Sequence, residues 1–540
     1  MTNIPFSEVR ENSKIVIGKE IQVELPSQPV RYYRHGWQSW SLAAWTDPSP
    51  IPIPRPAIFH PLQVDAVHVH KKYLNGSWLG AVEFEDGNIL LIGALAVAAN
   101  VSLVQNQLSG QSEADEIEWF LAFGQENIIF EGYAKELGNR LGETKRKESP
   151  RVWCSWYSLY SAINERILHS IFDTFGDLPF DVLQVDDGWQ MDIGDWEANR
   201  KFPSGMKALA EKIQSTGRRA GVWLAPLIAT KSSKLFHEHT DWFLRREDGH
   251  LVSAGINWGE RLYALDTTHP DVSVWLVALM KQVRAWGYDY LKLDFLYGGA
   301  LKGKRFKDMP REAAYRECLQ TLRQAMGSDA FFLTCGTPIL PAIGICDAIR
   351  IGCDVAPYWE KYRDAYLLYN PTTPGTRNAI RTATHRLWLK PLLHIDPDVA
   401  YFESKRNSLT YEQRLLVQDL ARICDFKATS DLPQWMTTEE RNELFSFLDA
   451  KPEITRTGRY TFRVDGHVAD FRSASELPKV PTGLIALWGR LVGWLGDRYS
   501  ILRLYKILNL GMFRTRRSTY RVLRNTQNPT TSFSTLKQKQ

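Results

Sequence analysis

Two patterns of hydrophobic and polar positions follow one another along the chain. From residue 1 to about 140, short runs in which apolar and polar residues alternate are separated by turn residues. Alternation with a period of two is typical of strands that bury one face. We therefore expect an N-terminal β-sandwich domain over residues 1–140. Its strands are expected within 15–25, 65–74, 78–95 and 116–124, and a charged connector is expected over 135–150.

From Arg151 the pattern changes to apolar, strand-like runs that alternate with helical periodicity. Such alternation indicates an α/β protein, and the spacing favours a (β/α)8 TIM barrel over residues 141–450. The strands are expected within 151–158, 180–188, 219–227, 288–296, 330–336 and 347–354. The helices are expected at 164–175, 206–216, 272–287 and 311–326. In such barrels the chemistry lies at the carboxyl ends of the strands.

Residues 451–540 predict a short C-terminal extension. It begins with a small hairpin at 459–471, and apolar residues then recur at helical spacing, at Leu484, Leu487, Trp488, Leu491, Leu495 and Leu502. From 481 to 540 there are eleven Lys or Arg residues and one acid. A basic amphipathic tail of this kind can make a peripheral contact with an anionic membrane. The alternative is that the tail packs against the barrel.

The tail also decides how the overall charge is distributed. The chain carries +5 and the tail +10, so the first 480 residues carry −5. A mildly acidic body suits a neutral or cationic substrate better than a polyanion, and no nucleic acid partner is expected. The 19 tryptophans suit a sugar site, because a pyranose stacks on aromatic rings, although large barrels bury many aromatic residues in any case.

The cysteines and the N-terminus bear on the compartment. The six cysteines show neither a CxxC pair nor zinc-ligand spacing, and the first residues lack the apolar segment of a signal peptide. We therefore expect free thiols and a cytoplasmic protein. These features leave open whether the chain forms a homo-oligomer.

Cleavage of a glycosidic bond requires two carboxyl groups, one at the anomeric carbon and one that protonates the leaving oxygen. The first candidate is Asp294, which follows an apolar strand and shares a strand face with Lys292. A neighbouring ammonium keeps a carboxylate ionised, as a nucleophile requires. The alternative is a structural Lys–Asp pair at a strand end.

The second candidate is Asp354, with Arg350 four residues earlier and Tyr358 and Trp359 on an expected loop after it. Arg350 could donate a hydrogen bond to a sugar hydroxyl, and a partly aromatic environment would raise the pKa of a proton donor. The alternative is a solvated loop aspartate.

A third feature is the pair Asp186 and Asp187, which ends a buried strand run beside Trp189. At a barrel mouth two adjacent carboxylates can accept hydrogen bonds from vicinal hydroxyls of a sugar. A metal site is the alternative. No cluster of His, Cys and acid residues supports it, so no metal is expected.

Taken together, these motifs resemble glycoside hydrolase family 36, the melibiase-like α-galactosidases of clan D. The family places an Asp-Asp-Gly-Trp segment after its second strand, a Lys-x-Asp segment with the nucleophile after its fourth, and its acid/base after its sixth. The matching residues here are Asp186, Asp187, Gly188 and Trp189, then Lys292 and Asp294, then Asp354. The arginine four residues before the acid/base, Arg350 here, is shared with the related family 27. HIDPD at 394–398 resembles a weaker Asn-Asp-Pro-Asp element.

The resemblance implies a retaining double displacement, with Asp294 as nucleophile and Asp354 as acid/base, and it implies no cofactor. Asp186, Asp187, Lys292 and Arg350 would hold the sugar. Trp153, Trp189, Trp223 and Cys335 would line the pocket. In relatives a tryptophan of the sandwich domain reaches the barrel mouth, and the segment 34–41 offers Trp37 and Trp40 for this role, with structural packing as the alternative.

Three departures from the family pattern leave alternatives open. The nucleophile segment lacks the usual flanking Trp and Asn, a Ser-Gly-Gly-rich loop is replaced by 335–344, and the C-terminal β-domain is short. The expected function is hydrolysis of terminal α-D-galactosyl residues from an oligosaccharide or galactoside. The alternatives are an α-N-acetylgalactosaminidase, a galactosyl-transferring enzyme of the raffinose-synthase type, and a non-catalytic sugar-binding protein. Retention of both aspartates with Arg350 speaks against the last.

Overall fold

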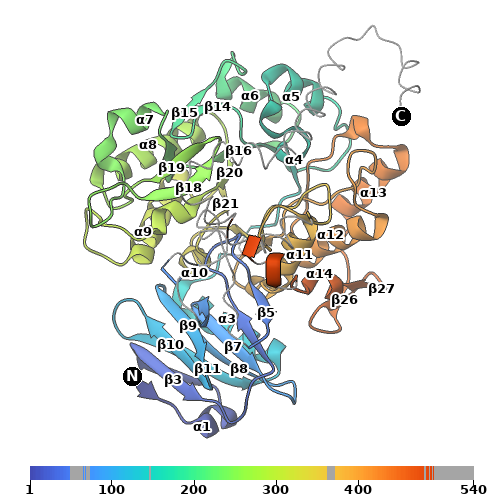
Figure 1. The fold of residues 1–540 in the computed structure, drawn as a ribbon. Helices are drawn as coiled ribbons and strands as arrows, with labels where there is room; N and C mark the ends of the chain where they lie inside the picture. The colour runs from blue at the N-terminus through green and yellow to red at the C-terminus, as the bar shows by residue number, and fades with distance from the viewer. Residues whose placement is uncertain are drawn as a thin grey trace.

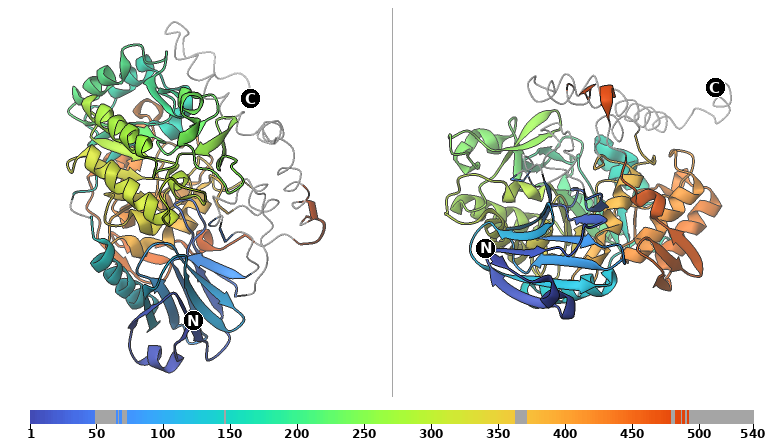
Figure 2. Two further views of the ribbon diagram at one scale, coloured as in Figure 1. Left: turned by 90° about the vertical axis from the view of Figure 1, so that its left-hand side faces the viewer. Right: turned by 60° about the horizontal axis from the view of Figure 1, so that its bottom comes forward.

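The computed structural model describes residues 1–48, 65, 67–68, 73–144, 147–361 and 371–478, together with 482–485, 487–488 and 491. A β-rich N-terminal domain lies at one end of a barrel, as Figures 1 and 2 show from three sides. Within the described residues, no helix is both long enough and apolar enough to cross a membrane.

The N-terminal domain consists of two sheets packed face to face. One contains, in spatial order, β1 (Thr2–Asn3), β3 (Glu20–Glu24), β10 (Gln107–Ser112), β9 (Ala99–Val104) and β6 (Leu74–Ser77). The other contains β2 (Lys14–Gly18), β11 (Ile117–Gly124), β8 (Ile89–Ala94), β7 (Leu79–Glu83), β4 (Arg31–Arg34) and β5 (Ala44–Thr46). Alternation is clearest in β3, where Ile21 and Val23 are buried between less buried polar residues. The expected strand at 65–74 lies mostly outside the described residues.

The expected connector is partly helical. Helix α3 (Glu126–Leu141) begins directly after the sandwich and packs on β8 and β11. Residues 135–141, expected to be a charged linker, therefore form its last two turns. The apolar positions Phe130, Tyr133 and Leu137 recur at helical spacing and are buried, which explains why this segment folds despite its charge.

The larger domain is a (β/α)8 barrel of eight parallel strands. In chain order these are β12 (Val152–Cys154), β13 (Val182–Val185), β16 (Arg219–Leu224), β20 (Tyr290–Leu293), β21 (Phe331–Thr334), β22 (Ala348–Arg350), β23 (His394–Asp396) and β24 (Ala428–Thr429). β24 pairs with β12, and a parallel bridge between Ala400 and Thr429 closes the ring. The strands are buried on both faces, as expected for parallel strands covered by helices.

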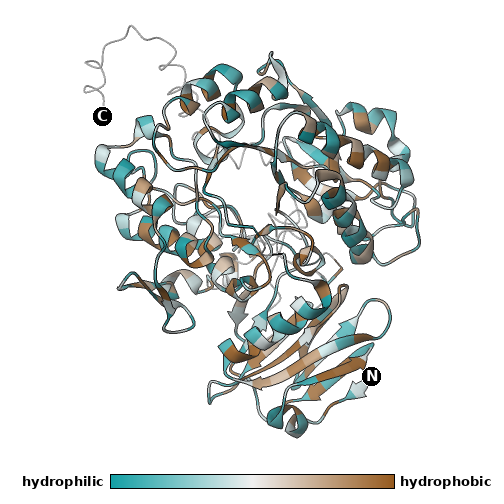
Figure 3. Ribbon diagram, turned by 180° about the vertical axis from the view of Figure 1, so that it is seen from behind, coloured by the Kyte–Doolittle hydropathy of each residue, from teal (hydrophilic) through white to brown (hydrophobic). Residues whose placement is uncertain are grey.

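The helices of the barrel are amphipathic, and Figure 3 shows hydrophilic and hydrophobic segments alternating along them. They are α5 (Glu165–Phe172), α6 (Gly205–Gln214), α8 (Pro270–Ala285), α9 (Arg311–Met326), α11 (Thr376–Thr384), α12 (Tyr411–Cys424) and α13 (Thr438–Asp449). Capping boxes start α12 at Thr410 and α13 at Thr437, which fixes where these helices begin.

Two small β-elements extend the loops at the carboxyl ends of the second and third strands, and the sequence analysis missed both. A hairpin of β14 (Gln190–Asp192) and β15 (Asp195–Ala198) follows β13. After β16, β17 (Ile228–Thr230), β19 (Glu260–Ala264) and β18 (Ser253–Asn257) form an antiparallel sheet. These insertions have no long apolar period, because they are short and half exposed.

The sandwich docks onto the barrel through the segment 36–41. Arg386, which is fully buried, donates hydrogen bonds to five backbone carbonyls, four of them in this segment and one at Ile351, just after β22. Glu312 of α9 accepts hydrogen bonds from the indole N–H groups of Trp37 and Trp78 at 2.8 Å each. The two domains are thus joined by buried polar contacts.

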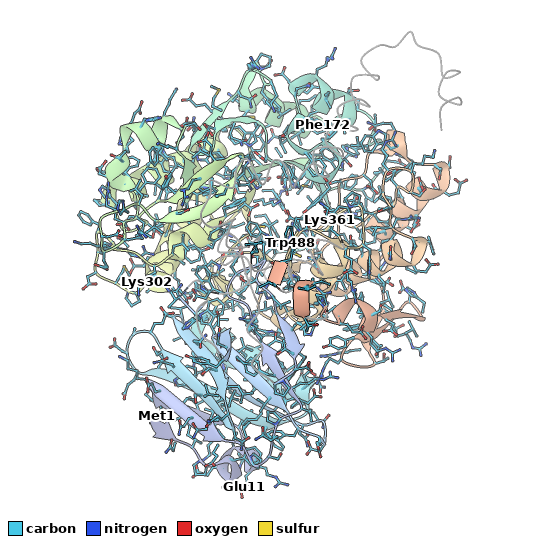
Figure 4. The ribbon with its side chains drawn as sticks, viewed as in Figure 1. Met1, Glu11, Phe172, Lys302, Lys361 and Trp488 are labelled. Atoms are coloured by element: carbon cyan, nitrogen blue, oxygen red, sulfur yellow. The ribbon has the colours of Figure 1, made fainter. Side chains whose placement is uncertain are left out.

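The C-terminal extension begins with a three-stranded sheet of β25 (Ile454–Arg456), β26 (Thr461–Val464) and β27 (His467–Asp470). The hairpin expected at 459–471 is confirmed. Of the predicted apolar stripe, Leu484, Leu487, Trp488 and Leu491 are described and are exposed; Trp488 is labelled in Figure 4. The remainder of the stripe, including Leu495 and Leu502, lies outside the described residues.

Candidate active site

The expected site residues follow the carboxyl ends of parallel strands, which meet at one end of a barrel. Asp186 and Asp187 follow the second strand, Asp294 follows the fourth, and Cys335 follows the fifth. Arg350 ends the sixth strand, and Asp354 lies four residues beyond it. The strand positions expected for these motifs are therefore those in the structure.

Asp294 is held by two N–H donors. The indole of Trp223 donates to one carboxylate oxygen at 3.0 Å, and the backbone N–H of Phe295 donates to the other at 2.7 Å. Phe295 has a positive φ of 53°, which is costly for a residue with a side chain and turns the chain sharply after the strand. Gly336 lies against this turn, where an added Cβ would come within 3.1 Å of the Phe295 backbone. Both oxygens of the buried Asp294 carboxylate are therefore held in a fixed orientation.

Lys292 pairs with Asp186, whereas the sequence analysis placed its ammonium beside Asp294. Its Nζ lies 2.9 Å from an Asp186 oxygen, and both side chains are buried. Burial by itself would lower the pKa of Lys292, but the Asp186 carboxylate raises it well above its ordinary value. Asp186 also accepts a hydrogen bond from Gln184 at 2.6 Å. Two side-chain donors therefore hold one oxygen of the Asp186 carboxylate in place.

Asp187 is bound by a residue that the sequence analysis did not single out. Trp258, at the tip of the β18–β19 hairpin, donates its indole N–H to Asp187 at 2.8 Å, and its ring lies 5.0 Å from that of Phe295. Burial raises the pKa of Asp187, while the donors Trp258 and Gln190 oppose that rise. Trp258 itself has a positive φ of 50°. Sequence analysis could have located this turn from Asn257 and Gly259, which flank Trp258, because both residue types favour tight turns between strands.

Asp354 lies in a different environment. Arg350 approaches it at 3.4 Å, but the same guanidinium binds Asp396 and Asp398 more closely, each at 2.9 Å. Burial raises the pKa of Asp354 to about 7, and the nearby Asp398 carboxylate adds to the rise, while Arg350 opposes it. The Asp354 side chain is 35% exposed, so this carboxyl group is accessible from solvent. It combines the properties of a proton donor at neutral pH.

The expected pocket tryptophans divide into two groups. Trp223 and Cys335 lie beside Asp294, with Trp223 bonded to it and burial together with Asp294 raising the pKa of the Cys335 thiol. Trp153 and Trp189 have no exposed surface, so neither can contact a sugar, which corrects the expectation for both. Trp153 packs on Phe172 of α5, labelled in Figure 4, outside the strands. Trp189 packs against other indoles and donates to the Trp223 carbonyl at 3.0 Å.

The sandwich domain contributes Trp40, and not Trp37, to the barrel mouth. Trp37 is fully buried against Arg311 and Glu312 and therefore has a structural role. The Trp40 ring packs edge-on against Phe295 at 5.0 Å, directly beside Asp294. Its indole N–H has no hydrogen-bond partner among the described residues. A sugar hydroxyl or water could accept from it.

One group of described side chains has the spacing of metal ligands, and it lies away from this site. It consists of Asp65, His68 and Glu113. Arg311 already binds both carboxylates, so a cation would have to displace a guanidinium. At the barrel mouth, by contrast, the carboxylates of Asp294 and Asp187 are bound by the indoles of Trp223 and Trp258.

Comparisons with known proteins identify relatives of this chain. Residues 131–323 match the family model described as Melibiase. An α-galactosidase from Thermus thermophilus, solved with p-nitrophenyl α-D-galactopyranoside, is 43% identical and superposes with a TM-score of 0.81, covering 85% of this chain and 94% of its own. The chain belongs to glycoside hydrolase family 36. A crystal structure of the family 36 α-galactosidase AgaA from Geobacillus stearothermophilus shares the fold at 15% identity, with a TM-score of 0.55 and coverage of 79% and 61%.

Curated family 36 relatives match over shorter stretches. Alpha-galactosidase AgaA of Geobacillus stearothermophilus is 28% identical over 162 residues, which is 28% of this chain and 22% of that protein. Alpha-galactosidase 1 of Pediococcus pentosaceus is 31% identical over 129 residues, covering 22% and 18%. These matches span about a fifth of the length of each curated relative.

Proposed function

We propose that this protein is a retaining α-galactosidase that removes terminal α-D-galactosyl residues from oligosaccharides. The observation that carries the proposal is the contrast between Asp294 and Asp354. Both oxygens of Asp294 accept hydrogen bonds from N–H donors, while burial and the Asp398 carboxylate raise the pKa of Asp354 to about 7. A pair of carboxyl groups with opposed environments is the pattern of a nucleophile and an acid.

In the first step the Asp294 carboxylate attacks the anomeric carbon while Asp354 donates its proton to the leaving oxygen. In the second step Asp354, now ionised, takes a proton from water, and the water oxygen displaces Asp294 from the sugar. Both inversions together retain the α configuration. Acid–base assistance of this kind contributes a factor of about 10²–10⁴.

The galactosyl group is held by the other site residues. Asp187 accepts hydrogen bonds from vicinal hydroxyls, and Trp258 orients it. Lys292 and Asp186 bind hydroxyls through the atoms that their mutual pair leaves free. Arg350 binds Asp396 and Asp398 at 2.9 Å and Asp354 at 3.4 Å, so it chiefly holds these carboxyl groups in place.

Support for the sugar comes from the relatives. The Thermus thermophilus enzyme was solved with stachyose as well as with the nitrophenyl galactoside. The matched test is a panel of nitrophenyl α-glycosides. Preference for the galactoside by at least tenfold over the N-acetylgalactosaminide and the glucoside is expected. Preference for the N-acetylated sugar would replace the proposal with the aminidase alternative, and turnover only in the presence of a sugar acceptor would indicate a transferase.

We also infer a cytoplasmic location. The six cysteines, all of them described, are unpaired and buried, which suits a reducing compartment. Fractionation of the native cells tests this, and recovery of the protein outside the cytoplasm would contradict it.

A further inference from the structure

A single buried guanidinium serves three carboxylates at the acid/base side of the site. Arg350 lies 2.9 Å from Asp396, 2.9 Å from Asp398 and 3.4 Å from Asp354. Three carboxyl groups around one guanidinium repel one another, which disfavours the ionised form of the group with the weakest partners.

The hydrogen bonds indicate which carboxyl group keeps its charge. One oxygen of Asp398 accepts from Arg350 at 2.9 Å, from the backbone N–H of Val355 at 3.0 Å and from the hydroxyl of Tyr157. Its other oxygen accepts from the backbone N–H of Val399 at 2.9 Å. Asp354 receives the same guanidinium at a longer distance of 3.4 Å. Burial and Asp396 raise the pKa of Asp398, while Arg350, Lys292 and the Tyr157 hydroxyl lower it. Because Asp398 has four donors and Asp354 one longer contact, we assign the negative charge to Asp398.

The backbone around Asp398 is shaped for this arrangement. Asp398 has a φ of 86°, in the left-handed region that residues with a side chain rarely adopt, and its side chain is fully buried. Its own N–H donates to Asp396 at 2.7 Å. Val355 directly follows Asp354, so the bond from its N–H ties the acid/base segment to the end of the seventh strand.

We propose that Asp398, held by Tyr157, Arg350 and Val355, is a positioning residue that keeps Asp354 protonated and fixes the segment that carries it. The proposal rests on the proposed function, because it assigns Asp398 a role only if Asp354 is the acid/base. Asp398 does not touch the substrate; it acts through Asp354.

The sign of the effect follows from the charges that face Asp354. Arg350 and Lys292 favour its ionised form, whereas the carboxylates of Asp398 and Asp294 disfavour it. Further titratable groups in the same surroundings are Asp396, Tyr157, Cys335 and Cys353. Loss of the Asp398 charge lowers the pKa of Asp354, so the acid would lose its proton at a lower pH.

The size of the shift in the pKa of Asp354 follows from the distance between the two carboxylates that contact the same nitrogen of Arg350. Because both carboxylates lie within 3.4 Å of one Arg350 nitrogen, their nearest oxygens can be no more than about 6 Å apart. Two like charges at that separation, in the effective dielectric of a partly exposed site, shift a pKa by roughly one to two units.

The test is the pH dependence of kcat/KM for a substrate with a poor leaving group, measured for Asp398→Asn and Tyr157→Phe. Asp398→Asn should move the alkaline limb down by about one to two pH units, and Tyr157→Phe should move it in the same direction by less. The matched control is Asp347→Asn, a buried aspartate at the opposite end of the sixth strand that pairs with Lys147 and Arg323, and it should leave the limb in place.

An alkaline limb within about 0.3 pH units of wild type in a folded Asp398→Asn variant would overturn the inference. So would a loss of activity that is equal at every pH, since that is the signature of a merely structural role. If Asp398→Asn does not fold, Tyr157→Phe decides by the same criterion. Persistence of the alkaline limb in Asp354→Gly would instead remove Asp354 as the acid and overturn the proposed function itself.

Discussion

Replacement of Arg386 by methionine tests whether the sandwich domain positions the active site. Methionine keeps the apolar length of the side chain but removes all five hydrogen bonds, which measure 2.5–3.0 Å. At about 1 kcal/mol net for each bond, the upper limit of the loss is about 5 kcal/mol. Burial lowers the pKa of Arg386 to about 10, so a desolvation cost is relieved, and a net loss of about 2–4 kcal/mol is expected.

The effect of Arg386→Met on kcat/KM depends on the backbone segment that loses its hydrogen bonds to Arg386. Four of the five carbonyls belong to 36–41, the segment that brings Trp40 against Phe295 beside Asp294. We expect Arg386→Met to lower kcat/KM for a nitrophenyl galactoside by about tenfold, the effect of roughly 1.4 kcal/mol at the transition state. Urea unfolding measures the loss of stability in the same preparation.

Arg316 provides the matched control. It donates three hydrogen bonds to carbonyls, including that of Leu141 at the end of α3, but it contacts no residue of the active site. Arg316→Met should lower stability and leave kcat/KM within about twofold of wild type. A normal kcat/KM in a destabilised Arg386→Met would refute the positioning argument, and an equal kinetic loss in both variants would show that the effect is global.

Three further outcomes are expected. The kcat/KM of the wild type should fall as pH rises through about 7, because the raised pKa of Asp354 keeps the acid protonated only below that value; a plateau to pH 9 would exclude this origin. Trp258→Phe should raise KM about tenfold, since loss of one hydrogen bond to a charged group costs about 1.5–3 kcal/mol, and an unchanged KM for galactosides would remove Trp258 from the sugar site. If the tail contacts membranes, co-sedimentation with anionic vesicles should decrease with added salt, and a chain ending at Val480 should lose it; equal binding of both forms would favour the packing alternative.

Six of the eight barrel strands could be predicted, because each is a short apolar run and a helix of clear periodicity follows each of the first four. The two-residue strand β24 is too short to give such a pattern. The aspartates at 186, 187, 294 and 354 could be placed because each follows such an apolar run. The partner of Lys292 could not be predicted from the sequence. Sequence proximity favoured Asp294, two residues away, whereas the partner in the structure, Asp186, is 106 residues away and follows β13, which is separated from β20 by β16.

Contacts between distant segments account for the other omissions. Tyr157 and Asp398 are separated by 241 residues, and Trp37 and Glu312 by 275, so no local pattern pairs them. The buried tryptophans were misassigned for a related reason. A tryptophan beside a catalytic motif has the same sequence signature whether its ring faces the mouth, as Trp223 does, or the helices, as Trp153 does.

The two-aspartate double displacement is tested most directly by the anomer of the azide product that each aspartate variant forms. Asp354→Gly still forms the covalent intermediate from an activated galactoside, so added azide should attack it and give α-galactosyl azide. In Asp294→Gly, azide should take the place of the nucleophile and give β-galactosyl azide in a single inversion. Proton NMR distinguishes the two products. Exchanged anomers would reverse the roles assigned to Asp294 and Asp354, and wild-type turnover in either variant would contradict the mechanism.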